Sequence, residues 1–430
     1  MAGTIVVDRI ESDASYASNI NVASQVTFSN TVAFAGSTSG TTTVVAAAVA
    51  GTTTLTLPAT SGTVLQSGTT VTEAQGGTGT TVGYYGFKNR IINGAMVISQ
   101  RNAGASVTVN DNPAVGLYPT DRFLVQGTTS AGVYTAQQST STPPAGFTNF
   151  LRMTTTTASA SPAAGAVYVM SQIIEGYNIA DFGFGAAGAS TITVSFWVRS
   201  SLTGTFSGSL RNGTAFNRSY PFTYAISSAN TWEQKSVTIA GDTSGTWSTG
   251  NTGGLVLAWD IGGGSTYAST ANTWQTGNYT AVTGSTRLIS TLSATLDITG
   301  VQLEKGSTAT SFDYRPYGTE LLLCQRYYAK TFNQTTAPAQ NTGYAGTLMA
   351  VGTGGKLVAN WNYPATMRAI PTLTTFSPND ATSNWYSAAG PTSIASLSGA
   401  GTTSAYIYDR DGNASNPYQY WIQATASAEL

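Results

Sequence analysis

Thr191-Ile-Thr-Val-Ser-Phe-Trp-Val198 is the stretch of sequence that most directly indicates the fold of this chain. Every second side chain in it, from Ile192 to Val198, is a large apolar group, so these side chains share one face of an extended strand. Such alternation is typical of a half-buried strand in an antiparallel sheet. Further β-rich runs, broken by Gly, Asn and Pro, occur at residues 167–174, 234–239, 254–259 and 295–304. Many short strands without helical periods between them predict an all-β protein built on a β-sandwich or jelly roll.

Changes in composition divide the chain into four segments. Residues 1–83, above all those after residue 20, are rich in Thr, Ser, Gly and Ala. Because so little apolar surface cannot offset the entropy of ordering a single chain, this segment is either disordered or an extended anchor and β shaft completed by identical chains. Short strands are expected in it at 54–57 and 62–66. The other segments are a jelly roll (84–317), a short linking helix (318–331) and a small C-terminal β-sandwich (332–430).

The linking helix is predicted from the residues near its two ends. Thr319 can cap the helix, and Glu320 suits the positive end of the helix dipole, whereas Lys330 suits the negative end. On this helix Cys324 would face the core as a small hydrophobic residue.

The residue types exclude most catalytic chemistry. The 430-residue chain has no histidine and a single cysteine, which excludes Ser-His-Asp and Cys-His systems, Cys/His zinc sites and an intrachain disulfide. Paired carboxylates remain as a route to glycoside cleavage. The 19 acidic residues are scattered singly, however, apart from Asp409 and Asp411 in a turn-like stretch. We therefore expect a structural or binding protein that is not an enzyme.

Charge and hydropathy limit the kinds of partner that the chain can have. The 18 basic and 19 acidic residues leave a net charge of −1, which provides no basic field for nucleic acid. The run of small apolar residues at 44–50 is far shorter than the roughly 20 residues that cross a bilayer, so we expect no membrane insertion. The first ten residues lack the features of a signal peptide, and we expect a soluble protein synthesised in the cytoplasm.

Aromatic residues in segment 332–430 are the candidates for binding a receptor or carbohydrate. Sugars are bound by flat aromatic faces together with amide and hydroxyl hydrogen bonds, and this segment supplies both. The alternative is that each of these rings belongs to the core or to a subunit interface. The candidates are Trp385, Tyr386, Tyr406, Tyr408, Tyr418 and Trp421.

One structural Ca²⁺ is the metal that this composition suits, because calcium takes oxygen ligands and needs no histidine. Asp297, in the strand-like run 295–304, is the first candidate ligand, and Asp121 is the second. For each, the alternative is an ordinary capped turn or a surface acid. No other cofactor is expected.

Three blocks of the sequence together resemble a bacteriophage tail-fibre family found in phages of marine and other aquatic bacteria. The first block, Leu55–Leu65, resembles a strand-turn-strand shaft repeat. The second is similar to the opening of a jelly-roll, carbohydrate-module-like domain, and the third to the end of that domain and the helix that leaves it. The second block comprises Asn89–Gly104 with Tyr118–Phe123. The third comprises Val301–Gly306, Phe312–Gly318 and Leu323–Tyr328, and a further match lies at Met367–Thr372.

The resemblance implies a virion structural protein of the phage tail or head surface. It would be a homotrimer, anchored through its N-terminus to other virion proteins. Its distal β domains would bind a glycan or protein on the host surface and so mediate host attachment, without catalysis. Two alternatives stay open: a capsid decoration or head-fibre protein, and a polysaccharide-cleaving tailspike.

Overall fold

The computed structural model describes residues 31–35, 41–45, 87–110, 116–128, 131–351, 357–387, 390–391, 396–409 and 418–430. The chain is nearly all-β, as predicted, with 42% of its residues in strands and 7% in helices. β1 (Thr31–Ala35) and β2 (Thr41–Val45) form an antiparallel hairpin in one unit, residues 1–67, and the other elements belong to a second unit, residues 68–430. The predicted strands at 54–57 and 62–66 lie outside the described residues, so the shaft and the homotrimer stay predictions.

Two antiparallel sheets form a β-sandwich over most of segment 84–317. The seven-stranded sheet has the order β15-β11-β10-β13-β8-β5-β4, and the six-stranded sheet has the order β12-β9-β17-β7-β6-β3. The chain crosses between the sheets repeatedly, which is the connectivity of a jelly roll. The strands are β3 (Val107–Val109), β4 (Leu117–Thr120), β5 (Phe123–Thr128), β6 (Val133–Ser139), β7 (Phe150–Thr157), β8 (Val167–Glu175), β9 (Ile192–Ser200), β10 (Gly204–Asn212), β11 (Arg218–Ile226), β12 (Glu233–Ile239), β13 (Gly253–Asp260), β15 (Gln275–Thr276) and β17 (Thr295–Lys305).

Short elements decorate the sandwich. β14 (Ala268–Ser269) and β16 (Ala281–Val282) pair in parallel, and the described part of the chain has four 3₁₀ turns. These turns are η2 (Gly176–Asn178), η3 (Ala180–Phe182), η4 (Ser265–Tyr267) and η5 (Leu288–Ser290). In the part of the chain that the structure describes, no helix has the length and apolar character of a membrane span.

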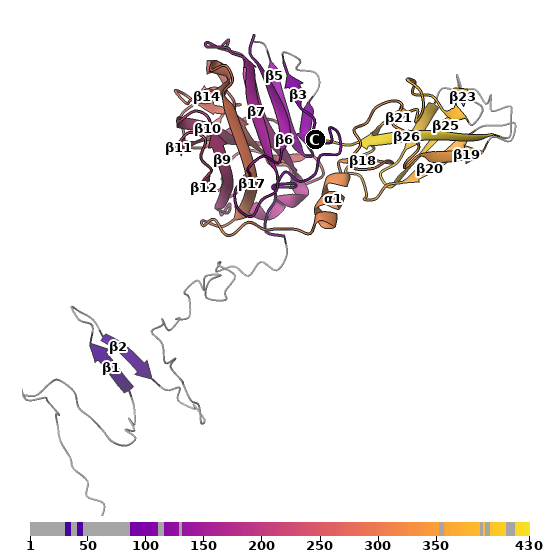
Figure 1. Ribbon diagram of the computed structural model, residues 1–430. Coiled ribbons are helices and arrows are strands. Elements are labelled where there is room, and N and C mark those ends of the chain that lie inside the picture. The colour runs from indigo at the N-terminus through magenta and orange to yellow at the C-terminus, as the bar shows by residue number, and fades with distance from the viewer. Residues whose placement is uncertain are drawn as a thin grey trace, which may run out of the picture. The chain divides into compact units, whose positions relative to one another are not determined.

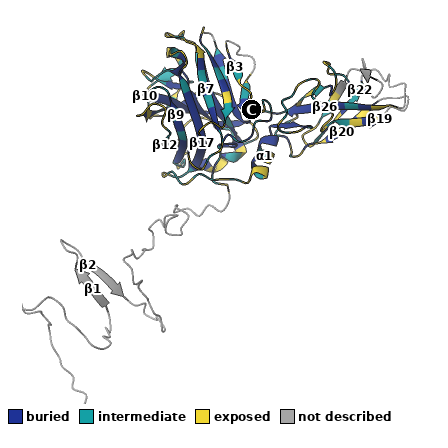
Figure 2. Cartoon of the chain, viewed as in Figure 1, coloured by how far each residue is buried: buried dark blue, intermediate teal, exposed yellow. Residues whose placement is uncertain are grey.

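The core of the sandwich lies between its two sheets (Figure 1). Ile192, Val194, Phe196 and Val198 of β9 are all fully buried, which confirms the prediction from their alternation. Phe196 packs edge-to-face on Trp259 of β13, with ring centroids 5.4 Å apart. Much of the strand length in the sandwich is coloured as buried in Figure 2, and the buried apolar side chains form one cluster, so the hydrophobic effect is the main force that joins the sheets.

The second and third sequence blocks meet in space at one end of the sandwich. The Asn89 side-chain amide donates to the carbonyl oxygen of Val301 at 3.0 Å, and its oxygen accepts from the backbone of Leu303 at 3.1 Å. The guanidinium of Arg315 donates to the carbonyl oxygen of Ile91 at 3.1 Å and forms an ion pair with Glu320 at 3.1 Å. These blocks therefore build one structural junction.

The linking helix differs from its prediction at both ends. α1 spans Tyr317–Gln325, its N-cap residue is Pro316, and Thr319 lies inside the helix. The predicted end near Lys330 is wrong, because Lys330 lies in β18 (Tyr328–Lys330), which pairs with β26 (Gln419–Ser427). Tertiary contacts override the local signals here. Arg326 forms an ion pair with Glu175 of β8 at 2.6 Å, so the chain leaves the helix at that point.

A second, smaller β-sandwich follows α1. Its first sheet is arranged around β26, and its second has the order β20-β25-β24, with a core of alanines and aromatic residues between them. The remaining strands are β19 (Leu348–Val351), β20 (Val358–Asn362), β21 (Thr372–Phe376), β22 (Tyr386–Ser387), β23 (Gly390–Pro391), β24 (Ser396–Ala400), β25 (Ser404–Asp409) and β26 (Gln419–Ser427).

Candidate functional site

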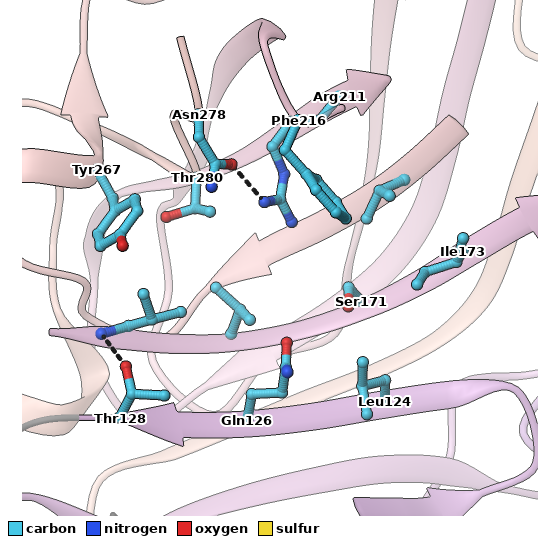
Figure 3. A pocket seen from close by; sticks show the side chains of 13 residues that line it. Leu124, Gln126, Thr128, Ser171, Ile173, Arg211, Phe216, Tyr267, Asn278 and Thr280 are labelled. Carbon is cyan, nitrogen blue, oxygen red and sulfur yellow. Dashed lines mark hydrogen bonds between the residues drawn. The ribbon is translucent and has the colours of Figure 1, made fainter. Parts of the chain in front are cut away.

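A cavity of about 290 Å³ lies on the outer face of the seven-stranded sheet, where side chains point away from the six-stranded sheet (Figure 3). Side chains of β5, β8, β10 and β13 line it from the sheet, and loop residues line it from the other side. The lining residues are Leu124, Gln126, Thr128, Val167, Val169, Ser171, Ile173, Arg211 and Val256 on strands, and Phe216, Tyr267, Asn278 and Thr280 in η4 and the loops.

The sequence of β13 explains how the cavity is covered. Leu255, Leu257 and Trp259 face the core between the sheets, whereas Val256 faces the cavity. All eight residues of β13 are nevertheless buried, because η4 and the following loops pack over the outer face. The continuous apolar run at 254–259 is therefore the mark of a strand that is covered on both faces.

Arg211 is the charged residue of the cavity. Its side chain extends from β10, with the residue only 7% exposed, and one Nη1–H donates to Oδ1 of Asn278 at 2.8 Å. The guanidinium carbon lies 5.2 Å from the centroid of the Phe216 ring, within the range of a cation–π contact. Burial lowers the pKa of Arg211 to about 10, while Tyr267 acts in the opposite direction. Arg211 therefore stays protonated at neutral pH inside a largely desolvated cavity.

The turn that presents Phe216 is held by one side chain. The carboxamide oxygen of Asn212 accepts from the backbone N–H groups of Asn217 and Arg218 at 2.9 and 3.1 Å, and its nitrogen donates to Asn217 Oδ1 at 2.8 Å. Phe216 has a φ of 49°, a left-handed conformation that is unfavourable for a bulky residue. Such strain persists only where the surroundings impose it, and it is typical of functional loops.

Several neutral polar groups also face the cavity. The Thr280 hydroxyl is buried and has no hydrogen-bond partner among the described residues. Gln126 and Ser171 contribute a side-chain amide and a hydroxyl, and Tyr267 contributes a ring and a phenol. The cavity thus combines aromatic faces, unused hydrogen-bonding groups and one cation.

One of the predicted aromatic site residues is a core residue. Trp385 is fully buried between the two sheets of the C-terminal sandwich, so its assignment to a binding surface is wrong. The hydrophobic effect favours this position, because a tryptophan supplies much of the apolar area of a small core.

Two of the predicted residues meet on the outer side of the β26 sheet. Tyr386 and Trp421 are half-buried, and both contact Tyr344, with ring centroids 5.9 and 5.3 Å from it. Tyr344 is 44% exposed and was missed in the sequence, because it lies in a loop without strand periodicity.

Tyr406 and Tyr408 lie on the outer side of the other sheet. Ile407 between them is fully buried, so both tyrosines point away from the core, with ring centroids 5.6 Å apart. Tyr418, 41% exposed, directly precedes β26. The predicted aromatic residues therefore do not form one site, because they are divided between two sheet faces and the core.

Asp297, the first candidate calcium ligand, lies in an ion-pair cluster. Asp297 is only 1% exposed, and its two carboxylate oxygens accept hydrogen bonds from Arg152 at 2.8 and 2.9 Å and from Arg199 at 2.8 Å. Two guanidinium groups neutralise this carboxylate and occupy most of its lone pairs, which a cation would need. These ion pairs disfavour calcium at Asp297, and the Ca²⁺ ligand stays a prediction that chelation tests.

Asp121 is also a structural carboxylate. It accepts hydrogen bonds from the backbone and the side chain of Gln100 at 3.0 and 2.5 Å, and Arg101 lies 3.8 Å away. Burial raises the pKa of this carboxyl, while Arg101 and the bonds from Gln100 act in the opposite direction. Among the residues with described positions, no group of three Asp, Glu, His or Cys side chains is close enough to hold a metal ion.

No protein-family model and no curated protein matches the chain. The solved structures similar to it include the enzymatically active domain of tailspike protein 4 of bacteriophage CBA120, at 12% identity and a TM-score of 0.26, covering 51% of this chain and 22% of that chain. TmCBM61 in complex with β-1,4-galactotriose has 11% identity and a TM-score of 0.24, covering 46% and 99% of the two chains.

The family 11 carbohydrate-binding module from Clostridium thermocellum, in complex with a β-1,3-1,4-mixed-linked tetrasaccharide, has 8% identity and a TM-score of 0.23, covering 49% and 98%. Similarity at this level does not carry a ligand from one protein to another, so we argue function from the residues of this chain.

Proposed function

We propose that this chain is a carbohydrate-binding fibre protein of a bacteriophage virion, which attaches the particle to a glycan on the host surface without cleaving it. The observation that carries the carbohydrate-binding part is the cavity on the seven-stranded sheet, with its rings, its polar side chains and the unpartnered hydroxyl of Thr280. The phage assignment is supported by the sequence blocks described above.

The contents of the cavity suit a sugar. Sugars present hydroxyl groups around their edges and apolar C–H groups on their faces. Gln126, Ser171 and Thr280 can exchange hydrogen bonds with hydroxyls, and Phe216 and Tyr267 offer rings. The volume of about 290 Å³ is near the lower end of small-molecule sites, roughly 300 Å³, so the cavity takes a short segment of a glycan.

The lining also supports binding without cleavage. Glycoside hydrolysis requires two carboxyl groups on either side of the scissile bond. None of the described residues that line the cavity is Asp or Glu. Asp260, nearby on the same strand as Val256, is 1% exposed, and its Oδ1 accepts the backbone N–H groups of Gly262 and Gly263 at 3.1 and 2.7 Å.

Attachment to a cell does not require a tight single site. Several copies per particle raise the overall avidity by orders of magnitude when they engage one surface together. The exposed tyrosines on the C-terminal sandwich, Tyr344, Tyr406 and Tyr418, lie on separate faces and provide further points for weak contacts with a receptor.

The test uses the purified full-length chain on an array of bacterial surface glycans. We expect binding of a subset of glycans, a loss of at least tenfold in affinity for Phe216→Ala, and no change for Tyr177→Ala, which removes a ring that is 64% exposed in η2. No binding to any glycan, or an equal loss in both variants, would refute the assigned site.

Two further measurements test the rest of the proposal. Incubation of the chain with a bound polysaccharide should leave the polysaccharide length unchanged, and shortening would favour the tailspike alternative. Antibody labelling of intact particles should decorate the tail; labelling confined to the capsid would favour a decoration or head-fibre protein.

A further inference from the structure

We infer that the glycan bound in this cavity is acidic and that its carboxylate or sulfate group pairs with Arg211. This inference rests on the proposed carbohydrate-binding function and adds the class of sugar to it. The observation that carries it is a buried cation aimed into the cavity for which the described residues supply no counter-ion.

Other buried arginines of the chain show how unusual this is. Arg122 is 2% exposed and forms an ion pair with Glu429. The side chain of Arg315 is 3% exposed and pairs with Glu320. Arg211, in contrast, has only the neutral amide oxygen of Asn278 as a hydrogen-bond partner among the described residues. A buried charge without a partner is costly, so its retention at the edge of a cavity points to a partner that arrives from outside.

The geometry leaves part of the guanidinium free for such a partner. Nη1 is used by Asn278, whereas Nε is buried and has no hydrogen bond within the described part of the chain. Figure 3 shows the guanidinium between Asn278 and Phe216. Carboxylates and sulfates accept two parallel N–H bonds from one edge of a guanidinium group, which a neutral hydroxyl does not.

No carboxylate among the residues that the structure describes takes this role. Asp260, on the neighbouring strand β13, is held by Gly262 and Gly263, and its electrostatic partner is Arg287 rather than Arg211. Tyr267 acts electrostatically on Arg211 through a phenol, not a carboxylate.

Neutral groups around Arg211 would hold the rest of the sugar. The unpartnered hydroxyl of Thr280 and the side chains of Gln126 and Ser171 line the same cavity. An acidic sugar would therefore place its charged group on Arg211 and its hydroxyls on these three residues. Its ring would pack against Phe216.

The experiment compares matched oligosaccharides on the full-length chain by calorimetry. The probes are a uronic-acid oligosaccharide with its carboxyl-reduced form, a sulfated oligosaccharide with its desulfated form, and inorganic sulfate. We expect at least one acidic member to bind at least tenfold more tightly than its neutral counterpart. The carboxylate and sulfate arms identify which acid group the site prefers.

Arg211→Gln removes the charge and keeps a hydrogen-bonding side chain, so it should abolish the difference between acidic and neutral probes while leaving the melting temperature of the free protein unchanged or higher. Arg211→Lys keeps the charge but cannot donate two parallel N–H bonds, so it should retain part of the preference for acidic probes. Lys305→Gln, which removes a charge at the end of β17 in the other sheet, is the matched control. It should change neither the preference for acidic probes nor the melting temperature.

The outcomes separate this inference from the proposed function. Equal binding of acidic and neutral probes, or an equal effect of Arg211→Gln on both, would overturn the inference and leave carbohydrate binding intact. Binding of inorganic sulfate as tight as that of the sulfated sugar would reduce the site to a simple anion site and also overturn it. Failure of every glycan to bind would refute both.

Discussion

Removal of the Asp297 carboxylate is expected to destabilise the sandwich strongly. Asp297 on β17 joins three strands, because it bonds to Arg152 on β7 and Arg199 on β9. Asp297→Ala would leave two adjacent guanidinium groups without their shared counter-ion. Breaking a buried ion pair by removing one partner costs about 3–5 kcal/mol.

The exposure of the two arginines sets the expected magnitude. The side chain of Arg199 is 12% exposed and stays desolvated, whereas that of Arg152 is 35% exposed and can regain water. We therefore expect the lower end of that range, about 3 kcal/mol. For a domain of this size, such a loss corresponds to a fall in melting temperature of roughly 6–12 °C.

The assay is thermal unfolding of the full-length chain with and without EDTA. Asp181→Ala is the matched control, because Asp181 also contacts two cations, Arg90 and Lys305, but its side chain is 43% exposed. Its loss should cost less than about 1 kcal/mol. A fall for Asp297→Ala no larger than that of Asp181→Ala, or an EDTA-induced fall that Ca²⁺ reverses in the unmodified chain, would refute the ion-pair interpretation.

Two further predictions concern stability. Burial raises the pKa of Asp260 from 3.8 to about 6, so the folded chain binds a proton more tightly than the unfolded chain, and stability falls as the pH rises through this interval. The free energy of unfolding of Asp260→Asn, relative to that of the unmodified chain, should therefore rise by up to about 3 kcal/mol between pH 4 and pH 7.5. Urea midpoints measure this difference, and a difference that does not change with pH would contradict the prediction. Trp385→Ala should cost about 3–5 kcal/mol because its ring is fully buried, whereas Trp421→Ala on the outer face should cost under about 2 kcal/mol; similar losses in the two variants would show that both rings are core.

The strands of the jelly roll were predictable because their signal is local. Alternation in residues 191–198 requires only that one face of a strand be buried, and the structure places these residues in β9 as expected. The end of α1 was not predictable in the same way. Lys330 suits a helix C-terminus by charge, but its backbone pairs with Thr425 of β26, a partner far along the chain.

The same distinction explains the outcome for the acidic candidates. Asp297 lies in a strand and is buried, and burial implies that its carboxylate has a partner. The identity of the partner depends on strand order: Arg152 and Arg199 are 145 and 98 residues away in the sequence. Calcium and arginine both satisfy a buried carboxylate, and only the pairing of β17 with β7 and β9 decides between them.

Arg211 could not be identified as a site residue from the sequence because its significance depends on what is missing around it. A basic residue near the end of a strand is ordinarily exposed, and a partner for it could lie anywhere in the chain. Its burial arises when η4 and the loop that carries Asn278 fold over β10, more than fifty residues later. Only once these segments are in place can one see that no described carboxylate lies next to Arg211, which is the observation on which the proposal of an acidic ligand rests.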